Sequence, residues 1–471
     1  MNTVAPKMSA REYWTTIKRS IAGDHNADYT RGPIGQAVFL LSVPMVLEMM
    51  MESVFAVTDI FFVARLGAEA VAVVGLTEAV LTLVYALAIG LSMGATAMVA
   101  RRIGEKDPEA AAVAAGQVLL VGLVISALIG GLGVTYAGDV LQLMGAGAAV
   151  VEQGVGYTAI LLGGSVTIMF LFLINAVFRG AGDASIAMRS LWLANGVNIV
   201  LDPCLIFGLG PFPELGLTGA AIATTIGRGV GVVYQLYYLL GTKGRIRIEL
   251  RHLQLVPKVA LRFLRISVGG VAQFLVATSS WIVLMRLMAT YGSAAVAGYT
   301  IATRVIIFAL LPSWGMGNAA ATLVGQNLGA AKPERARRSV WTAARFNFIA
   351  MMLVAIVFIS IPGTIIGVFD KDPEVLRYGI ACLRWISYGF GFYAIGTVVV
   401  HAFNGAGDTL TPTWINLLCF WVIQIPLAYA LAETLSLGPT GVFIAVMLAE
   451  SFMAVVAILV FRRGRWQHRV V

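Results

Sequence analysis

Twelve apolar stretches, separated by short polar connections, constrain the fold of this chain more than any other feature. A transmembrane helix needs about 20 predominantly apolar residues, and each stretch is long enough to supply them. The stretches cover residues 34–63, 70–98, 112–135, 148–178, 186–208, 218–242, 266–290, 294–318, 339–362, 375–401, 412–432 and 440–461. We therefore predict an all-α membrane protein with twelve transmembrane helices.

The composition agrees with a polytopic membrane protein. Hydrophobic residues make up 59% of the chain and charged residues only 12%, whereas a soluble domain carries about 25% charged residues. The three cysteines, Cys204, Cys382 and Cys419, lie in apolar runs and show neither a disulfide framework nor metal-ligand spacing. We expect them to be small core residues, and we expect no bound cofactor.

The net charge of +9 is distributed as in a membrane protein rather than a nucleic-acid-binding one. Of the 33 lysines and arginines, 24 lie in the two terminal tails and in alternate connections, while the other connections hold only Arg65 and Lys371. Positive charge gathers on the cytoplasmic side of membrane proteins. We therefore expect a multi-pass protein of the cell inner membrane with both termini in the cytoplasm, where basic residues contact anionic lipid. Within the first tail, AREYWTTIKRSI fits either an amphipathic surface helix or a solvated segment.

The two halves of the chain match at a single offset of 225 residues. ARLGAEAVAV (64–73) lies over ATYGSAAVAG (289–298), and FRGAGD (178–183) lies over FNGAGD (403–408). Further matching pairs are Gly67 and Gly292, Gly90 and Gly315, Gly104 and Gly329, and Pro108 and Pro333. A repeat of six helices returns the chain to the same side of the membrane, so the halves are parallel repeats, a recurring plan in secondary transporters.

The repeat divides the chain into two expected lobes. The boundaries are a cytoplasmic tail over 1–33, an N-lobe over 34–242, a basic cytoplasmic linker over 243–265, a C-lobe over 266–462 and a second tail over 463–471. Two lobes that rock about a central cavity give alternating access. We expect the chain to act as a monomer.

Three acids share one face of the first expected helix. Glu48, Glu52 and Asp59 fall within about 40° of one another at 100° per residue. A charge at the bilayer centre costs at least ~2.5–3.5 kcal/mol and usually marks a pathway. Because three neighbouring carboxylates in a poorly solvated lobe cannot all be ionised, we expect a proton or a bound cation to neutralise part of the charge. Glu48 has an alternative position near one membrane face, where a solvated acid is ordinary.

The stretch NGVNIVLDP places Asn195, Asn198 and Asp202 on one face of the fifth expected helix. We expect Asn198 and Asp202 to meet Asp59 inside the N-lobe, with Asn175 nearby. Amide and carboxylate oxygens suit a hard ion such as Na⁺, and they suit a proton relay equally well. The alternative role of the amides is to hold helices together.

These polar residues belong to the N-terminal half alone. Their counterparts at the same offset are Gln273 for Glu48, Ala277 for Glu52, Leu284 for Asp59, Val400 for Asn175, Ile423 for Asn198 and Leu427 for Asp202. Packing demands common to both halves would not leave acids in only one of them. Two further acids, Glu78 and Glu450, stand alone within expected helices, and each could pair with an arginine such as Arg228 or Arg304.

In its ordered set of motifs the chain resembles the prokaryotic multidrug and toxic compound extrusion (MATE) transporters over about residues 33–462. The matching pieces are VPMVLEMMMESVFAVTDIFFVARLG, NAVFRGAGD, NIVLDPCLIFGLGPFPELGLTGAAIATTIGR, VGQNLGAAKPERA and FNGAGD. The resemblance implies two six-helix lobes and antiport, in which H⁺ or Na⁺ enters while an organic, mainly cationic compound leaves.

The resemblance is closer to the branch of DNA-damage-inducible F proteins than to the branch called NorM. In the former, the cation site of the N-lobe falls on Asp59, Asn175, Asn198 and Asp202, which makes them the expected H⁺ or Na⁺ site. The second acidic site of NorM falls here on Gln273 and Tyr393, so that site is not expected. Glu48, Glu52 and Asn195 are candidates for an additional proton or substrate site.

Three other functions remain open from the sequence. A flippase for lipid-linked oligosaccharides needs a cationic lining, which the intramembrane arginines Arg189, Arg228, Arg286, Arg304 and Arg384 could supply. A non-transporting protein could bind a partner through residues 243–265. An enzyme is not expected, since the single intramembrane histidine, His401, has no evident nucleophile or metal partner. Between the two coupling ions, the clustered acids favour H⁺.

Overall fold

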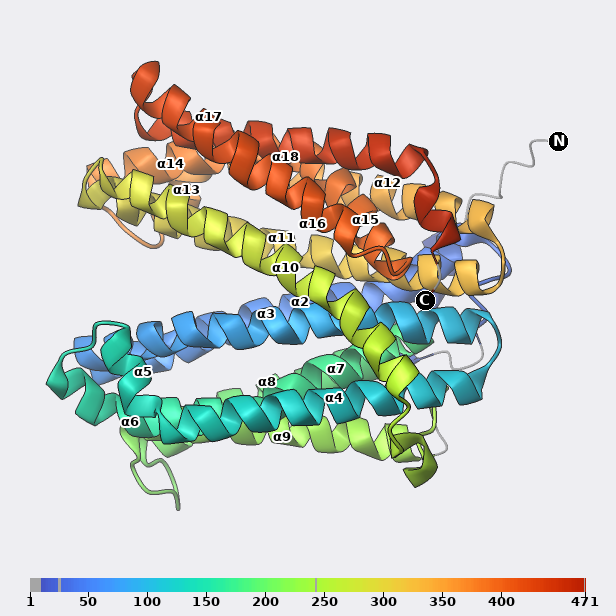
Figure 1. Ribbon diagram of the computed structural model, residues 1–471. Coiled ribbons are helices and arrows are strands. Elements are labelled where there is room, and N and C mark those ends of the chain that lie inside the picture. Colours follow the sequence, from blue (N-terminus) through green and yellow to red (C-terminus); the bar gives the residue numbers. More distant parts are fainter. Residues whose placement is uncertain (1–9, 24–26, 242–243, 470) are drawn as a thin grey trace.

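The computed structural model describes residues 10–23, 27–241, 244–469 and 471, apart from the side chains of residues 10–13, 56, 57, 59, 60, 64 and 68. The chain forms two helical lobes (Figure 1). The N-lobe contains α2 (Ile34–Val63), α3 (Ala68–Gly104), α4 (Pro108–Thr135), α5 (Ala137–Leu143), α6 (Ala148–Gly163), α7 (Ser165–Ala181), α8 (Ala184–Phe207) and α9 (Gly216–Leu240). The C-lobe contains α10 (Pro257–Ala289), α11 (Ser293–Gly329), α12 (Pro333–Ser360), α13 (Pro362–Ile366), α14 (Pro373–Ser387), α15 (Phe390–Gly405), α16 (Leu410–Asn416), α17 (Ile425–Tyr429) and α18 (Pro439–Arg462).

The predicted all-α membrane architecture is confirmed. Within the described residues, eleven helices or joined helices are long and apolar enough to cross a membrane, and the pair α14 and α15, bent by 57°, makes a twelfth. Three details differ from the expected spans. The seventh span begins at Pro257, inside the expected linker, and the eighth continues to Gly329. The eleventh is interrupted by π-helical segments at Leu417–Gln424 and Ala430–Thr434.

The internal repeat extends to backbone geometry. Gly67 and Gly292, which precede α3 and α11, have φ of 102° and 95°. Gly182 and Gly407, which end α7 and α15, have φ of 89° and 81°. Only glycine adopts such angles without strain, so the conserved offset of 225 reflects the same turns made twice.

The two lobes contact each other reciprocally at one end of the molecule. A Cβ atom on Gly104 would lie 2.0 Å from the backbone oxygen of Gln326, and one on Gly329 would lie 2.1 Å from that of Arg101. Gln326 and Arg101 are themselves related by the offset of the repeat. The contact therefore occurs twice with the lobes exchanged, as expected for halves related by a two-fold axis.

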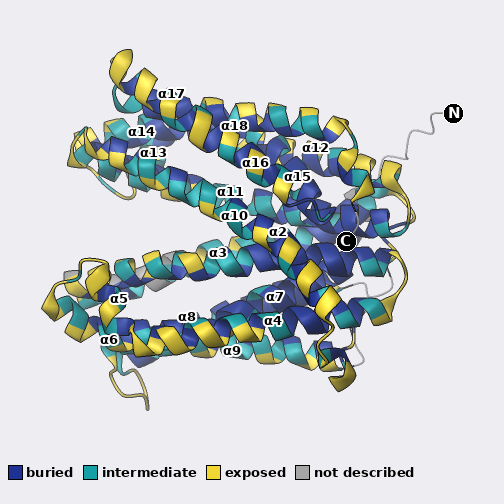
Figure 2. Cartoon of the chain, viewed as in Figure 1, coloured by how far each residue is buried: buried dark blue, intermediate teal, exposed yellow. Residues whose placement is uncertain are grey.

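The lobes converge at the end that holds the C-terminus and diverge at the opposite end (Figure 1). We call these the convergent and divergent ends. Buried residues concentrate toward the convergent end (Figure 2). Along α2, Leu41 and Met45 are fully buried in a cluster with residues of α11, α12 and α15, whereas Met50, Val54 and Phe61 are exposed. Met45 is therefore a core residue, and α2 is packed against both lobes near the convergent end only.

Two terminal segments cross between the lobes at the convergent end. Arg335 of α12 donates to the backbone oxygens of Tyr29, Arg31 and Gly32. Arg245 of the linker, which pairs with Asp183 of the N-lobe at 3.3 Å, donates to the backbone oxygen of Ala27. In the C-terminal segment, the Arg469 guanidinium pairs with Asp408 at 3.1 Å, and its backbone oxygen accepts from Arg101 at 2.8 Å. The expected amphipathic segment forms α1 (Ala10–Ala22).

Candidate functional site

The polar residues of the N-lobe lie at successive levels along α2 and α8 rather than in one site. At 1.5 Å per residue, Glu48 and Asp59 are separated by about 16 Å along α2. Three groups of contacts follow one another from the convergent toward the divergent end. One ion cannot contact all the residues that the sequence brought together, so each level is described separately.

The level nearest the convergent end is the inner cluster, defined as Glu48, Asn175, Arg179, Ser190 and Gln235. Glu48 is 1% exposed, and its Oε1 accepts from Arg179 Nη1 at 2.9 Å and from Asn175 Nδ2 at 3.1 Å. Asn175 Oδ1 accepts from Ser190 Oγ at 3.0 Å and from Gln235 Nε2 at 2.6 Å. The alternative of a solvated Glu48 near a membrane face is therefore wrong, since this acid forms a buried ion pair between α2 and α7.

The C-lobe contains an uncharged counterpart of this ion pair. Gln273 and Asn404, which lie at the repeat offset from Glu48 and Arg179, exchange hydrogen bonds of 3.3 and 3.2 Å. The same position in both lobes is therefore occupied by a bonded polar pair. This favours a structural role for the Glu48–Arg179 pair, since the fold uses an amide pair for the same contact elsewhere.

The middle level joins Glu52 to an arginine. Asn195 Nδ2 donates to Glu52 Oε2 at 3.4 Å. Arg228 of α9 lies within electrostatic reach of Glu52 and donates from Nη2 to the Tyr85 hydroxyl at 2.6 Å. Glu78 lies within electrostatic reach of the same tyrosine. Glu52 therefore has a nearby cation that is held in place by Tyr85.

The level nearest the divergent end is the outer cluster, defined as Asn198, Asp202 and Thr224. Asn198 Nδ2 donates to Asp202 Oδ1 at 3.2 Å and to Thr224 Oγ1 at 3.1 Å. Asp202 is completely buried, and Asn198 is 2% exposed. The buried Asn198 Oδ1 accepts no hydrogen bond among the described residues. Its lone pairs are available to a proton donor or a cation.

Close packing of α8 on α9 builds the outer cluster. A Cβ atom on Gly227 would lie 2.6 Å from the backbone oxygen of Ala194 and 3.0 Å from Asn198 Cβ. The missing side chain at Gly227 lets α9 approach α8, which brings Thr224, one turn earlier, within hydrogen-bonding distance of Asn198. Asp59 lies on the helical backbone of α2, but its side chain is outside the described residues, so its meeting with Asn198 and Asp202 stays a prediction.

Sequence reasoning grouped Asn175 with Asn198 and Asp202, but the hydrogen bonds of the described side chains join it to the inner cluster instead. It also missed Arg179, which the charge count treated as a residue of a connection. A signal for Arg179 was present, since FRGAGD and FNGAGD differ at this residue and Glu48 changes to Gln273 in step. Thr224, Gln235 and Tyr85 gave no such signal.

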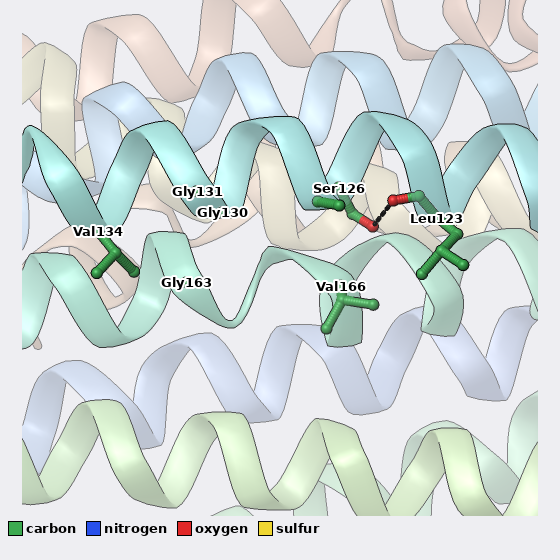
Figure 3. Close-up of a pocket in the computed structure, with 8 residues that line it drawn as sticks. Leu123, Ser126, Gly130, Gly131, Val134, Gly163 and Val166 are labelled. Atoms are coloured by element: carbon green, nitrogen blue, oxygen red, sulfur yellow. Dashed lines mark hydrogen bonds between the residues drawn. The ribbon is translucent and has the colours of Figure 1, made fainter.

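Three other features contribute no binding chemistry. His401 Nδ1 bonds to the Thr397 backbone oxygen at 2.9 Å, one helical turn away. A surface groove between α4 and the junction of α6 and α7 is lined mainly by glycine and apolar residues (Figure 3). The one hydroxyl of that groove, on Ser126, donates to the Leu123 backbone oxygen at 3.1 Å. Among the described residues, no three His, Cys, Asp or Glu side chains are grouped to hold a metal.

Comparisons with known proteins agree with the two-lobed arrangement. A family model described as MatE matches residues 44–204 and again residues 270–430, more than half of the chain. The chain is 27% identical over 449 residues to "Probable multidrug resistance protein NorM" of Thermotoga maritima, covering 93% of this chain and 94% of that protein. It is 26% identical over 423 residues to "FAD transporter" of Shewanella oneidensis, covering 90% and 93%.

A solved structure supports the same assignment. It is described as "Outward-facing conformation of a multidrug resistance MATE family transporter of the MOP superfamily", and it matches this chain with a TM-score of 0.87 and 28% identity. The match covers 92% of this chain and 96% of that one. Two copies of one family motif, twelve candidate spans and this likeness agree, and the chain belongs to the MatE family of multi-pass membrane transporters, not to an enzyme family.

Proposed function

We propose that this protein exports organic, mainly cationic compounds by alternating access, coupled to inward movement of H⁺ or Na⁺. The observation that carries the proposal is the outer cluster of the N-lobe. There a fully buried Asp202 lies beside Asn198 Oδ1, which accepts no hydrogen bond from the part of the chain that the structure describes. The counterparts that sequence reasoning assigned in the C-lobe are apolar. Buried acids of this kind mark ion pathways in membrane proteins.

Asp59 is the proposed third member of the coupling site. Phe62, one turn beyond Asp59 on α2, lies with its ring centroid 6.4 Å from that of Phe207 at the end of α8. The divergent ends of α2 and α8 are therefore adjacent, which supports the proposal that Asp59 and Asp202 act together. Asn175 supports the site indirectly in this proposal, since it donates to Glu48 and accepts from Ser190 and Gln235 rather than binding the outer cluster. The residue pattern still favours the branch of DNA-damage-inducible F proteins.

Helix α2 would transmit the coupling between the site and the lobes. On one side α2 packs closely against α11 of the C-lobe. A Cβ atom on Gly315 of α11 would lie 2.6 Å from the Met45 backbone oxygen of α2. On its other side, Trp192 of α8 donates to the Leu47 backbone oxygen at 3.1 Å. An ion shifts the conformational equilibrium only if it binds one arrangement more tightly than the other. Neutralising acids between α2 and α8 changes their contact and so changes how α2 packs against the C-lobe.

The distribution of basic residues orients the molecule in this proposal. The convergent end carries the basic connections and the C-terminus, which supports a cytoplasmic position for this end. The lobes then diverge toward the outside, an outward-facing arrangement. Export of each positive charge costs about 2.3 kcal/mol per 100 mV of inside-negative potential, so an inward ion must drive it.

A transporter of anionic compounds is the alternative. One relative is described as an FAD transporter, and Arg228 lies inside the N-lobe. A flippase for lipid-linked oligosaccharides is a second form of the same alternative. Of the five arginines expected to line such a cavity, Arg189 donates to the Ala22 backbone oxygen, and Arg228 binds Tyr85. These contacts leave fewer cations for a pyrophosphate than the sequence suggested.

Efflux from proteoliposomes tests the proposal. Vesicles with wild-type protein and a fluorescent organic cation are given a proton gradient or a sodium gradient separately. We expect one gradient to drive efflux in wild type, and we expect Asp202→Asn and Asp59→Asn to abolish it. Asp139→Asn, an exposed acid of α5, is the matched control and should transport normally. Efflux at the wild-type rate in Asp202→Asn would refute the site, and no efflux in wild type would favour the flippase.

A further inference from the structure

The C-lobe contains one carboxylate that the proposed coupling site does not use. Glu450 lies in the middle of α18 and is half-buried, and its buried Oε2 has no hydrogen-bond partner among the described residues. No charged group of the described residues lies within electrostatic reach of it. Of the two arginine partners that the sequence suggested, Arg228 is engaged in the N-lobe and Arg304 of α11 is exposed. An uncompensated acid inside a membrane is costly, so its retention points to a function.

The N-lobe has the opposite charge at the equivalent position. LGLTGAAIA at the start of α9 (215–223) matches LGPTGVFIA at the start of α18 (437–445). Gly219 and Gly441 in these stretches both allow the preceding helix to approach, with a Cβ atom placed 2.3 Å from Leu205 O and 2.6 Å from Ala432 N, respectively. In this register Glu450 falls on Arg228. At this position the N-lobe therefore has a positively charged arginine, whereas the C-lobe has a glutamate.

Tyr393, Asn416 and Gln424 lie on helical segments that pack against α18, the helix of Glu450. Tyr393 of α15 lies within electrostatic reach of it, and Trp314 of α11 donates to the Tyr393 hydroxyl at 2.6 Å. Cys419 of the π-helical segment also lies within electrostatic reach. Asn416 Oδ1 and Gln424 Oε1 belong to the same span as Cys419, and both are buried without a hydrogen-bond partner among the described residues. Asn416 is 7% exposed and Gln424 is 1% exposed. π-Helical turns of this kind are frequent at functional sites.

These groups share one chemistry. A carboxylate, carbonyl oxygens and aromatic faces all attract positive charge, and an aromatic face adds the cation–π attraction that recognises ammonium groups. We propose that Glu450, with Tyr393 and Trp314, binds the positively charged group of the exported organic cation. This inference deepens the proposed function and rests on it. It places the substrate charge in the C-lobe and the coupling ion in the N-lobe, so the two cations occupy different carboxylates.

Binding to the purified full-length protein tests the subsite. The probe is tetraphenylphosphonium, a permanent aromatic cation, compared with an uncharged aromatic compound that the wild type also binds. We expect Glu450→Gln to weaken tetraphenylphosphonium binding at least 10-fold and to leave the uncharged compound within 2-fold. Trp314→Phe should weaken the cation less, and Glu450→Asp should retain most of the affinity because it keeps the charge. Glu433→Gln, an exposed acid near the divergent end, is the matched control.

Three outcomes would overturn the subsite. Unchanged cation affinity in Glu450→Gln is the first. The second is an equal loss for both compounds in Glu450→Gln and Glu450→Asp, which would indicate a packing role. The third is loss of ²²Na⁺ binding with intact tetraphenylphosphonium binding, which would assign Glu450 to the coupling ion. Failure of the proposed function looks different, since wild type would then neither bind nor export the cation.

Discussion

The buried ion pair between Glu48 and Arg179 allows a quantitative test of its role, because the C-lobe carries the uncharged version of the same contact. Glu48→Gln removes the carboxylate that accepts from Arg179 and Asn175. The guanidinium, only 10% exposed, would stay charged without a counter-ion. Breaking one partner of a buried pair costs about 3–5 kcal/mol. For a lobe of about 200 residues this corresponds to a fall of roughly 6–20 °C in the unfolding temperature.

The double variant Glu48→Gln/Arg179→Asn copies Gln273 and Asn404 into the N-lobe. It removes both charges and installs an amide pair that the fold already accommodates at the equivalent position. We expect it to recover most of the lost stability, so that the two substitutions are strongly non-additive in a double-mutant cycle. Thermal unfolding in detergent measures the stability, and proteoliposome efflux measures transport, which the double variant should retain.

A surface ion pair serves as the control. Arg102 and Glu105 approach more closely, at 2.7 Å, but both side chains are partly exposed. Glu105→Gln should therefore cost less than about 1 kcal/mol. The reasoning is refuted if Glu48→Gln is no more destabilising than Glu105→Gln, or if the double variant loses as much stability as its two single variants combined. A stable double variant that has lost ion-coupled efflux would make Glu48 part of the coupling pathway.

Three further predictions address the lobe contact and the outer cluster. Gly329→Ala places a Cβ atom 2.1 Å from the Arg101 backbone oxygen and should destabilise the convergent end by about 1–3 kcal/mol; Gly131→Ala, with open space around its Cβ, should be tolerated in the same unfolding assay. Trp192→Phe removes the indole donor to the Leu47 backbone oxygen and should lower the amount of substrate exported per ion consumed. Trp421→Phe loses the similar bond to the Val276 backbone oxygen in the C-lobe and should leave this ratio unchanged. Equal effects of the two substitutions would contradict the role of α2. Thr224→Val removes a hydrogen bond from Asn198 and should weaken binding of the coupling ion about 10-fold, by the 1–3 kcal/mol typical of a buried unsatisfied amide; unchanged ion binding would contradict the site.

The helices and their repetition could be predicted from the sequence because the signals are long and local. Apolar length sets each span, and glycines such as Gly182 and Gly407 recur where the backbone needs a positive φ. The offset of 225 holds up to these turns. Beyond them the π-helical segment Leu417–Gln424 rotates the following residues relative to α8. Gln424 is therefore buried in the C-lobe, although the fixed offset paired Asn198 with its neighbour Ile423.

The grouping within the site was harder to predict, because helical periodicity gives the face of a residue but neither its depth nor its partner. Glu48, Glu52 and Asn195 share an interior with Asn198 and Asp202, yet hydrogen bonds divide them among three levels. Arg179 lies at the end of α7, where sequence counting places it outside the membrane. Its long side chain reaches back to Glu48, and only the paired change to Gln273 and Asn404 in the other half hints at this contact.

The central claim is that a cation bound at the outer cluster changes the separation of the lobes. We would measure it with spin labels at the divergent end, on Leu143 of the N-lobe and Val368 of the C-lobe, both largely exposed. The native cysteines would first be replaced. Acidification or addition of Na⁺ should shift the distance distribution in wild type, and Asp202→Asn should abolish the shift for the coupling ion. The same shift in Asp202→Asn as in wild type would contradict the account.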